Sequence, residues 1–525
     1  MNQVFQALRR APVWAVAPLC GLAAGLAHPP TGFLPGLLGH AGLLLLCQSA
    51  PSLRDAFWRA WLAGTAYFAV SCWWVFEAFQ VDAATFGWMA PFAVALLAGG
   101  LALFWGLAGL VFRAGRRDNP LTVVWFAGAF ASLEWLRGHL LTGFPWNLPG
   151  ETWRAGGMMS QSASIVGVYG LTWMTLAIAV TPALLVVNPK RRSSWIATGL
   201  AALTLASMAG FGAAYLRSAP DHPGRPVTLR IVQANFPEVD RYPDPLYRTM
   251  LDRYAALTAQ PSSGGAPPQL VFWPEGALPR SIGEILTDGG PARSAITEAL
   301  SPGQTLVFGG YDVRGSTEKP IFYNSLIAVR RTVDSLAPVG LYDKHRLVPF
   351  GEYMPPFLKA LGIEHLVPAP GDFDIGPPPA PLGIGPVTIQ PLICYESLFP
   401  GFTRHGERLS GRRADLIVNL SNDSWFGATS GPLQNFNLSS YRAIEEGLMM
   451  VRSTPNGVSA VIDAHGRPAD GRSLGLGAMG VVDVAINTVQ FDTAYRRYGD
   501  GAFAGMLLIS LLALGAIALG RRVRA

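Results

Sequence analysis

The sequence predicts an α-helical membrane bundle of eight spans joined to an α/β domain outside the membrane. Half of the 525 residues are hydrophobic and only 14% are charged, whereas soluble domains carry about a quarter charged residues. Long apolar runs occupy both ends of the chain, and the stretch between them alternates short β-branched runs with Gly and Pro turns. This pattern excludes a plain soluble enzyme, a disordered chain and a fibrous protein.

Eight apolar runs approach the roughly 20 residues that a helix needs to cross a bilayer. They span residues 11–27, 33–49, 57–79, 88–112, 121–141, 164–187, 195–216 and 502–520. The first run also has the length of a signal peptide, but it lacks a small-residue cleavage pattern leading into a soluble region. The order is therefore seven spans, a large soluble block and one more span.

Lys and Arg gather in alternate loops and at both ends of the chain, at 9–10, 54–59, 113–117, 190–192 and 521–524. Because basic loops favour the cytoplasmic side of a membrane, we expect both termini in the cytoplasm and residues 217–500 outside it. Three parts follow: a membrane domain at 1–222, a soluble domain at 223–495, and a C-terminal span with a basic tail at 496–525.

The net charge of +6 does not lie on the soluble block. Residues 1–222 carry 13 Lys and Arg against 7 Asp and Glu, residues 223–495 carry 22 against 26, and residues 496–525 carry 5 against 1. A nucleic-acid surface needs a basic folded domain. We therefore expect no nucleic-acid partner.

Glu134 and Arg137 lie three residues apart in the fifth apolar run, on one face of the predicted helix. Charges at membrane depth are costly and usually paired. The two residues are either a structural ion pair or a contact for a lipid head group.

Residues 223–495 read as alternating strands and helices separated by turns. The expected strands are 227–233, 269–273, 304–310, 323–329, 387–393, 415–420, 457–462 and 479–485, and the expected helices are 245–259, 291–300 and 433–450. Pro- and Gly-rich stretches at 261–268 and 366–386 predict surface loops, the second long enough for a lid. The block is therefore predicted to be an α/β sandwich.

Cys394 is the single cysteine of this block, so it has no partner there for a disulfide. An isolated cysteine is usually buried and inert. This one, however, ends the apolar run 387–393, a position that exposes a nucleophile at the edge of a sheet. Glu275 and Lys344 also follow apolar runs. A carboxylate, an ammonium and a thiol at strand ends can meet at one rim.

Each of these three groups has a use in acyl transfer. A thiol with a pKa of about 8.5 needs a base or a positive neighbour to react at neutral pH. Glu275 can take and return its proton, and Lys344 can stabilise a thiolate and an oxyanion. The eight His residues show no paired ligand spacing, and no phosphate-binding Gly loop is present. We expect neither a metal nor another cofactor.

Three motifs resemble the nitrilase, or carbon–nitrogen hydrolase, superfamily: Trp273-Pro274-Glu275, the run from Asp343 to Glu352, and Ile393-Cys394-Tyr395-Glu396. Gly143-Phe144-Pro145-Trp146 and the run from Asn422 to Gly427 extend the match. Together with the membrane spans, the order of these motifs closely resembles the apolipoprotein N-acyltransferase family. The resemblance implies a nitrilase-like αββα sandwich for the soluble domain.

The resemblance also implies a catalytic triad. Cys394 matches the nucleophile, Glu275 the base and Lys344 the lysine that stabilises the oxyanion. Glu352 matches a second glutamate that supports the site.

Four further positions are expected to support the site or bind substrate. Tyr395 and Glu396 match the pair that follows the nucleophile, and Trp425 lies near the same rim. Tyr242 stands where the family usually has Trp. Asn435 and Pro455 also depart from the family pattern. These departures bear on the choice of acceptor or phospholipid and leave the triad untouched.

The implied function is the last step of lipoprotein maturation at a bacterial inner membrane, with the soluble domain in the periplasm. The thiol takes an acyl chain from a phospholipid as a thioester, and the chain passes to the amine of the N-terminal diacylglyceryl-cysteine of an apolipoprotein. The partners are then these two substrates and the bilayer, and we expect a monomer. Alternatives are a membrane-tethered amidase or hydrolase, in which water accepts the acyl group, and an inactive lipid- or lipoprotein-binding scaffold. The intact triad speaks against the scaffold.

Overall fold

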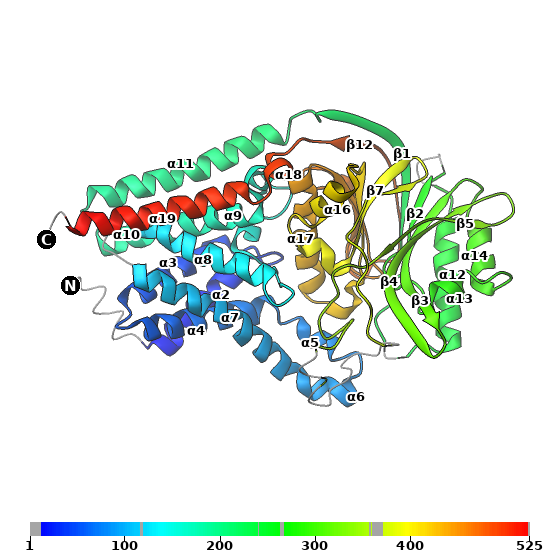
Figure 1. Cartoon of the computed structure of the whole chain (residues 1–525), viewed down its shortest axis with the longest axis horizontal. Helices are drawn as coiled ribbons and strands as arrows, with labels where there is room; N and C mark the ends of the chain where they lie inside the picture. Colours follow the sequence, from blue (N-terminus) through cyan, green and yellow to red (C-terminus); the bar gives the residue numbers. More distant parts are fainter. Residues whose placement is uncertain are drawn as a thin grey trace. The chain divides into compact units, whose positions relative to one another are not determined.

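The computed structural model describes residues 12–115, 119–239, 241–262, 267–355, 359 and 371–522. The chain divides into two compact units (Figure 1). The first comprises residues 1–76, 88–218 and 493–525, and the second comprises residues 77–87 and 219–492. Both ends of the chain therefore belong to one unit, which is interrupted by the other.

The first unit is built of helices. Its longer helices are α2 (Val13–Gly25), α3 (Leu38–Ser49), α4 (Leu53–Ser71), α7 (Ala90–Gly115), α8 (Thr122–His139), α9 (Ala163–Val180), α10 (Pro182–Val187), α11 (Arg192–Tyr215) and α19 (Gly501–Arg522). Its short helices are η1 (Leu34–Leu37), η3 (Pro149–Thr152), η4 (Met159–Ser162) and α18 (Ala494–Tyr498). Helix α6 (Ala83–Phe86) lies within residues 77–87 of the second unit, and α5 (Val75–Ala78) and η2 (Gly87–Met89) overlap the ends of that segment.

Three helical stretches of the described chain are long and apolar enough to cross a membrane: Ala83–Gly115, Met159–Val187 and Arg192–Tyr215. Val13–Gly25, Leu34–Ser49 and Gly501–Ala516 are apolar but shorter. Helices α4 and α8 fall on two further predicted runs, and each contains charged residues. The eight spans therefore stay a prediction.

Small residues allow α4 and α7 to approach closely, as expected for helices that pack in lipid. A Cβ atom added to Gly64 would lie 2.9 Å from the Cβ of Trp105, and one added to Gly109 would lie 2.5 Å from the Cβ of Ala60. A larger side chain at either glycine would push the two helices apart.

Glu134 and Arg137 form a buried ion pair within α8. The indole nitrogen of Trp105 donates to Glu134 at 2.5 Å, and the guanidinium of Arg137 also donates to the carbonyl of Phe144. Both charges are thus satisfied by protein groups. Of the two hypotheses from the sequence, the structural ion pair agrees with this geometry.

The second unit contains two six-stranded sheets (Figure 1). The first has the order β12-β1-β2-β3-β4-β5, formed by β1 (His222–Gln233), β2 (Leu270–Phe272), β3 (Thr305–Ser316), β4 (Lys319–Arg331), β5 (Leu336–Asp343) and β12 (Gly480–Gln490). The second has the order β11-β10-β9-β8-β7-β6, formed by β6 (Leu382–Ile384), β7 (Val387–Ile393), β8 (Leu416–Leu420), β9 (Met449–Ser453), β10 (Ser459–Ile462) and β11 (Pro468–Leu474).

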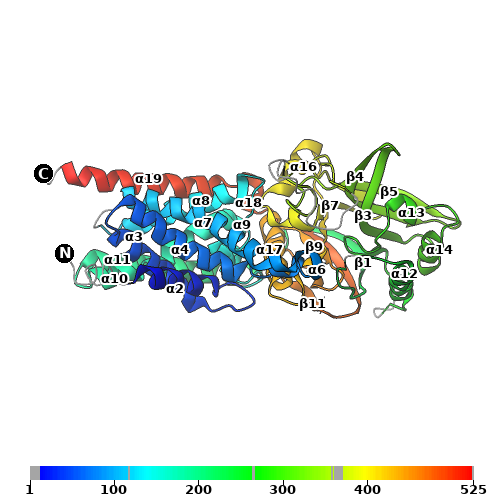
Figure 2. The same cartoon turned by 90° about the horizontal axis from the view of Figure 1, so that it is seen from below.

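The two sheets pack face to face, and helices cover their outer faces. Ile231 of the first sheet and Val418 of the second belong to one shared apolar core. Because successive strand residues face opposite sides, other side chains of the first sheet pack on α12 (Asp244–Ala259) and α14 (Pro291–Ala299). Helix α17 (Gly431–Glu446) lies on the far side, beyond the second sheet (Figures 1 and 2). The layers are helix, sheet, sheet and helix. Shorter helices are α13 (Ile282–Ile285), η5 (Cys394–Leu398), α16 (Phe402–Ser410) and η6 (Asp423–Phe426).

The predicted helix at 433–450 is wrong at its C-terminal end. Helix α17 ends at Glu446, because Gly447 adopts a φ of 64° and its N–H bonds the carbonyl of Ala443, the usual way in which a glycine ends a helix. Met449 and Met450 belong to β9 instead.

The two predicted surface loops lie partly outside the described residues. Residues 263–266 of the first and 366–370 of the second are not described. The described part of the second contains β6, which pairs with β7. The predicted surface loop over 366–386 is therefore wrong at its C-terminal end, where residues 382–384 form a strand.

Candidate functional site

Parallel strands of each sheet bring their carboxyl ends to one rim of the second unit. β1, β2 and β3 run parallel in the first sheet, and β7, β8 and β9 run parallel in the second. The residues that follow these strands supply most of the candidate site. This is the placement that the apolar runs of the sequence predict.

Cys394 directly follows β7 and begins η5 with a φ of 46°. A positive φ is uncommon for a residue other than glycine, and such residues collect at functional sites. The turn removes the side chain from the alternating pattern of the strand. Cys394 as a whole is partly buried.

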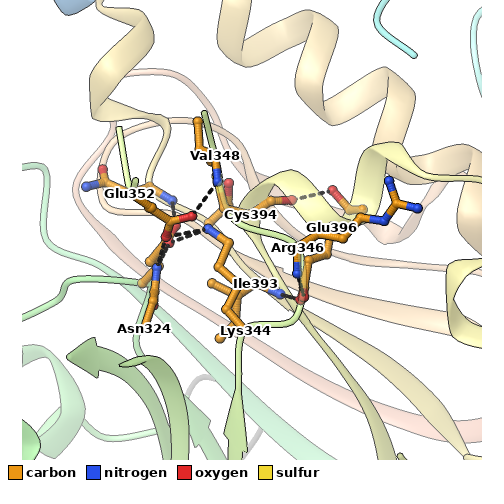
Figure 3. Close-up of polar contacts among 12 residues, drawn as sticks. Asn324, Lys344, Arg346, Val348, Glu352, Ile393, Cys394 and Glu396 are labelled. Carbon is orange, nitrogen blue, oxygen red and sulfur yellow. Dashed lines mark hydrogen bonds and ion pairs between the residues drawn. The ribbon is translucent and has the colours of Figure 1, made fainter. Parts of the chain in front are cut away.

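Lys344 directly follows β5, and its ammonium contacts the Glu352 carboxylate (Figure 3). Its Nζ is 2.9 Å from Glu352 Oε1 and 3.3 Å from Glu275 Oε1. Asn324 of β4 donates its amide to both carboxylates, at 2.7 Å to Glu275. Burial alone would lower the pKa of Lys344, but Glu275 and Glu352 outweigh it and hold this pKa above its ordinary value. The ammonium therefore stays charged at neutral pH.

Glu275 is held on three sides. Besides Lys344 and Asn324, which contact Oε1, the backbone N–H of Asn422 donates to Oε2 at 2.8 Å. Its backbone packs tightly on β3, since a Cβ added to Gly309 would lie 2.6 Å from the Cα of Glu275. The carboxylate is thus fixed in both position and orientation.

The Cys394 thiol is neutral in the resting protein. Burial, followed by the negative charge of Glu275, raises its pKa to about 12, although Lys344 and a hydrogen bond with Ser421 lower it. A neutral thiol needs a base that removes its proton as it reacts. The nearby Glu275 carboxylate has the chemistry of such a base.

Ser421 follows β8, the strand paired with β7. Its hydroxyl contacts the Cys394 thiol and donates to Asp423 Oδ1 at 2.9 Å. Asp423 is in turn paired with Arg452, 2.8 Å from its Nη2, and accepts a hydrogen bond from Asn435 at 2.9 Å. This buried network fixes the hydroxyl beside the sulfur.

Glu396 ties the segment that carries Lys344 to the segment that carries Cys394 (Figure 3). Its carboxylate accepts from the backbone N–H of Ile393 at 2.8 Å and from that of His345 at 2.8 Å. Further donors are Arg346 N and Tyr342 OH. Burial raises the pKa of Glu396 to about 7, against the lowering effect of its donors. The role of Glu396 is therefore structural, because its hydrogen bonds hold these two segments together.

The remaining predicted positions lie around this centre. The hydroxyl of Tyr242 donates to Glu238 at 2.8 Å. Tyr395 is buried next to Phe399, with ring centroids 5.0 Å apart. Trp425 is partly exposed in η6, within the loop that begins at Asn422. None of these three is among the side chains that bond the Lys344 ammonium in the described chain.

Sequence reasoning missed Asn324, Ser421, Asn422 and Glu238 as site residues. Ser421 and Asn422 follow a strand parallel to β7, so the strand-end rule that selected Cys394 also applies to them. Glu238 lies in the loop after β1. Asn324 is a neutral residue within β4 and leaves no comparable signal. Within the described ranges, no group of three or more His, Cys, Asp or Glu side chains is placed to hold a metal ion.

Two family descriptions match the chain in separate parts. Residues 229–495 match the carbon–nitrogen hydrolase family, and residues 20–181 match the apolipoprotein N-acyltransferase N-terminal domain. The second unit therefore places the protein in the carbon–nitrogen hydrolase class. The helical part that precedes it in the chain matches a different family description, that of the apolipoprotein N-acyltransferase N-terminal domain.

Full-length relatives identify the family within this class to which the chain belongs. It is 52% identical to an apolipoprotein N-acyltransferase of Caulobacter vibrioides, covering 97% of this chain and 95% of the relative. It is 34% identical to one of Brucella melitensis, covering 96% and 95%. The chain belongs to the apolipoprotein N-acyltransferase family. Among solved structures, it is similar to the nitrilase-superfamily protein Nit3 of Saccharomyces cerevisiae, with 17% identity, coverage of 51% and 93%, and a TM-score of 0.35.

Proposed function

We propose that this protein moves a fatty acyl chain from a phospholipid to the α-amine of the diacylglyceryl-cysteine at the start of an apolipoprotein, through a thioester on Cys394. The observation that carries the proposal is the rim at which a thiol, a fixed carboxylate and a charged ammonium meet. The name of the full-length relatives supports N-acylation of an apolipoprotein.

In the first half-reaction, Glu275 takes the proton of the Cys394 thiol as the sulfur attacks the ester carbonyl carbon. The carbonyl electrons move to oxygen, and the Lys344 ammonium stabilises the oxyanion. The ester C–O bond then breaks, and Glu275 gives its proton to the departing lysophospholipid oxygen. An acyl thioester remains on Cys394.

In the second half-reaction, the acceptor amine attacks the thioester carbonyl, and Glu275 takes a proton from the nitrogen. The C–S bond breaks, and Glu275 returns this proton to the leaving sulfur. The products are an amide and the free thiol. Asn324 and Glu352 position Lys344 and Glu275 through both steps, by the hydrogen bonds described above.

Formation of an acyl-enzyme on Cys394 tests this proposal. We expect that purified protein incubated with acyl-labelled phospholipid gains the mass of one acyl chain on the peptide containing Cys394, with an equal amount of lysophospholipid. A diacylglyceryl-cysteine peptide should then discharge the label as an amide. Mass spectrometry measures both steps.

Two variants and one alternative product sharpen this test. Cys394→Ala should form no adduct, whereas Cys72→Ala, at a buried cysteine of the first unit, should behave as the wild type. Persistent turnover of Cys394→Ala would reject the nucleophile. Free fatty acid in place of the acylated peptide would indicate a hydrolase.

We also propose that the chain crosses the inner membrane eight times, with the second unit in the periplasm and both termini in the cytoplasm. We expect a cysteine at Ser294, exposed on α14, to react with an impermeant maleimide in spheroplasts. A cysteine at Lys190, in a basic loop, should react only after permeabilisation. Both changes are made in a background with Cys20→Ala and Cys394→Ala, because these two native cysteines are partly exposed. Labelling of Lys190→Cys first would reverse the orientation.

A further inference from the structure

Glu238 lies in the loop after β1 and reaches the catalytic rim through Asn422. Its Oε2 accepts a hydrogen bond from the side-chain amide of Asn422 at 2.7 Å. The backbone N–H of the same Asn422 donates to Glu275 Oε2 at 2.8 Å. One residue therefore bonds both carboxylates, and Glu238 lies next to the candidate base without touching Lys344 in the described contacts.

The loop that carries Glu238 is held in a defined conformation. Asn235 adopts a φ of 53°, and its N–H donates to the carbonyl of Pro455 at 2.7 Å. The Ser424 hydroxyl donates to the carbonyl of Phe236 at 3.2 Å. These bonds join the loop to the segments after β8 and β9. The Glu238 carboxylate is thus positioned before any substrate arrives.

The partners of Glu238 are neutral donors in the part of the chain that the structure describes. Tyr242 OH donates to Oε1, and Asn422 donates to Oε2. Burial and, more weakly, the nearby Glu275 raise the pKa of Glu238. The Lys344 ammonium is already shared by Glu275 and Glu352. In these surroundings, a cation supplied by a ligand would stabilise the charged form of the carboxylate.

We propose that Glu238 is a binding residue for a primary ammonium group, that of the acceptor's N-terminal cysteine. This assignment rests on the proposed function and adds a subsite to it. An α-amino group has a pKa of about 7.7–8.0 in water, so the acceptor arrives largely as an ammonium ion. The bound ammonium loses one proton to solvent water before it reacts. The neutral nitrogen then attacks the thioester carbon beside Glu275, which takes the second proton as described above, and Glu238 is joined to Glu275 by a single residue.

An ammonium group can also come from the head group of an amine-bearing phospholipid. That nitrogen lies several bonds beyond the ester carbonyl, on the far side of a phosphate. The nitrogen of the acceptor is the reacting atom itself. Proximity to Glu275 therefore favours the acceptor, and the choice of phospholipid donor in the experiment separates the two sources.

The experiment measures the two half-reactions of Glu238→Gln separately. Gln keeps an oxygen that can accept from Asn422 and removes the charge. With phosphatidylglycerol as donor, we expect thioester formation within twofold of the wild type. With preformed acyl-enzyme, the acceptor concentration for half-maximal transfer should rise roughly tenfold or more, as a charge-assisted hydrogen bond becomes a neutral one. Asp244→Asn, at an exposed carboxylate of α12, is the matched control and should leave both steps unchanged.

A neutral nucleophile provides an internal reference that does not depend on how much of the sample is folded. Cleavage of the same acyl-enzyme by neutral hydroxylamine should be equal in wild type and Glu238→Gln, so the ratio of acceptor transfer to hydroxylamine cleavage should fall about tenfold. An unchanged ratio would overturn the assignment. Slower thioester formation from phosphatidylethanolamine alone would overturn it in favour of the donor head group. Absence of any thioester in the wild type would instead reject the proposed function.

Discussion

Replacing Lys344 with Met is expected to lower turnover about a hundredfold or more, the loss typical of a removed oxyanion donor. Met follows the course of the buried lysine stem but carries no charge. The two carboxylates that Lys344 bonds, at 2.9 and 3.3 Å, are bridged by Asn324 and would face each other without a cation. One of them then binds a proton more readily. A Glu275 carboxyl that already holds this proton cannot take the one on Cys394, and the oxyanion would lose the cation that stabilises it.

Lys359→Met is the matched control for this change. Lys359 is half exposed and pairs with Asp372, and exposed ion pairs contribute about 0–1 kcal/mol. Turnover of this variant should therefore equal that of the wild type. The measurement is the single-turnover rate of thioester formation, with the thermal unfolding curve as the check on folding. A loss of less than threefold in Lys344→Met would remove Lys344 from the proposed mechanism.

The three residues of the candidate triad could be found from the sequence because each follows a short run that ends a strand: Glu275 and Cys394 follow predicted strands, and Lys344 follows the run at 340–343, which forms the end of β5. Position after a strand is a local property, visible as a polar residue that ends an apolar run. β2 and β7 each pair with a parallel strand, and β5 runs in the same direction as β3 because β4 is antiparallel to both. This common strand direction converts the local property into proximity. Asn324 could not be found in this way, because it lies within β4 and contacts Glu275 and Glu352 only after both sheets have formed.

The strands that the sequence did not indicate are mostly edge strands. β5 and β6 are terminal strands of their sheets, as is β11. An edge strand pairs on one side only and tolerates Pro and Gly, and β5 contains Pro338 and Gly340. The alternation of apolar and polar residues is correspondingly weak. β9 is an inner strand, and it was missed because its first residues extend the apolar pattern of α17 past Gly447.

Replacing Arg452 with Met is expected to lower the free energy of unfolding by about 3–5 kcal/mol, the cost of leaving a buried charge without its partner. Both side chains of the Arg452–Asp423 pair are 0% exposed. After the change, the donors that Asp423 retains in the described part of the chain, Ser421 and Asn435, are neutral. Its uncompensated negative charge lies close to Cys394, whose pKa it already raises. Alkylation of Cys394 by iodoacetamide should therefore slow as well.

Thermal unfolding of the purified protein measures the first effect, and the double variant separates charge from packing. Asp423→Asn combined with Arg452→Met removes both charges, so most of the lost stability should return, since replacing both members of a buried pair is often close to neutral. Arg467→Met is the matched control, because Arg467 pairs with Asp463 at the surface and is 46% exposed. If Arg452→Met unfolds at the same temperature as Arg467→Met, the buried pair does not hold the loop behind the thiol.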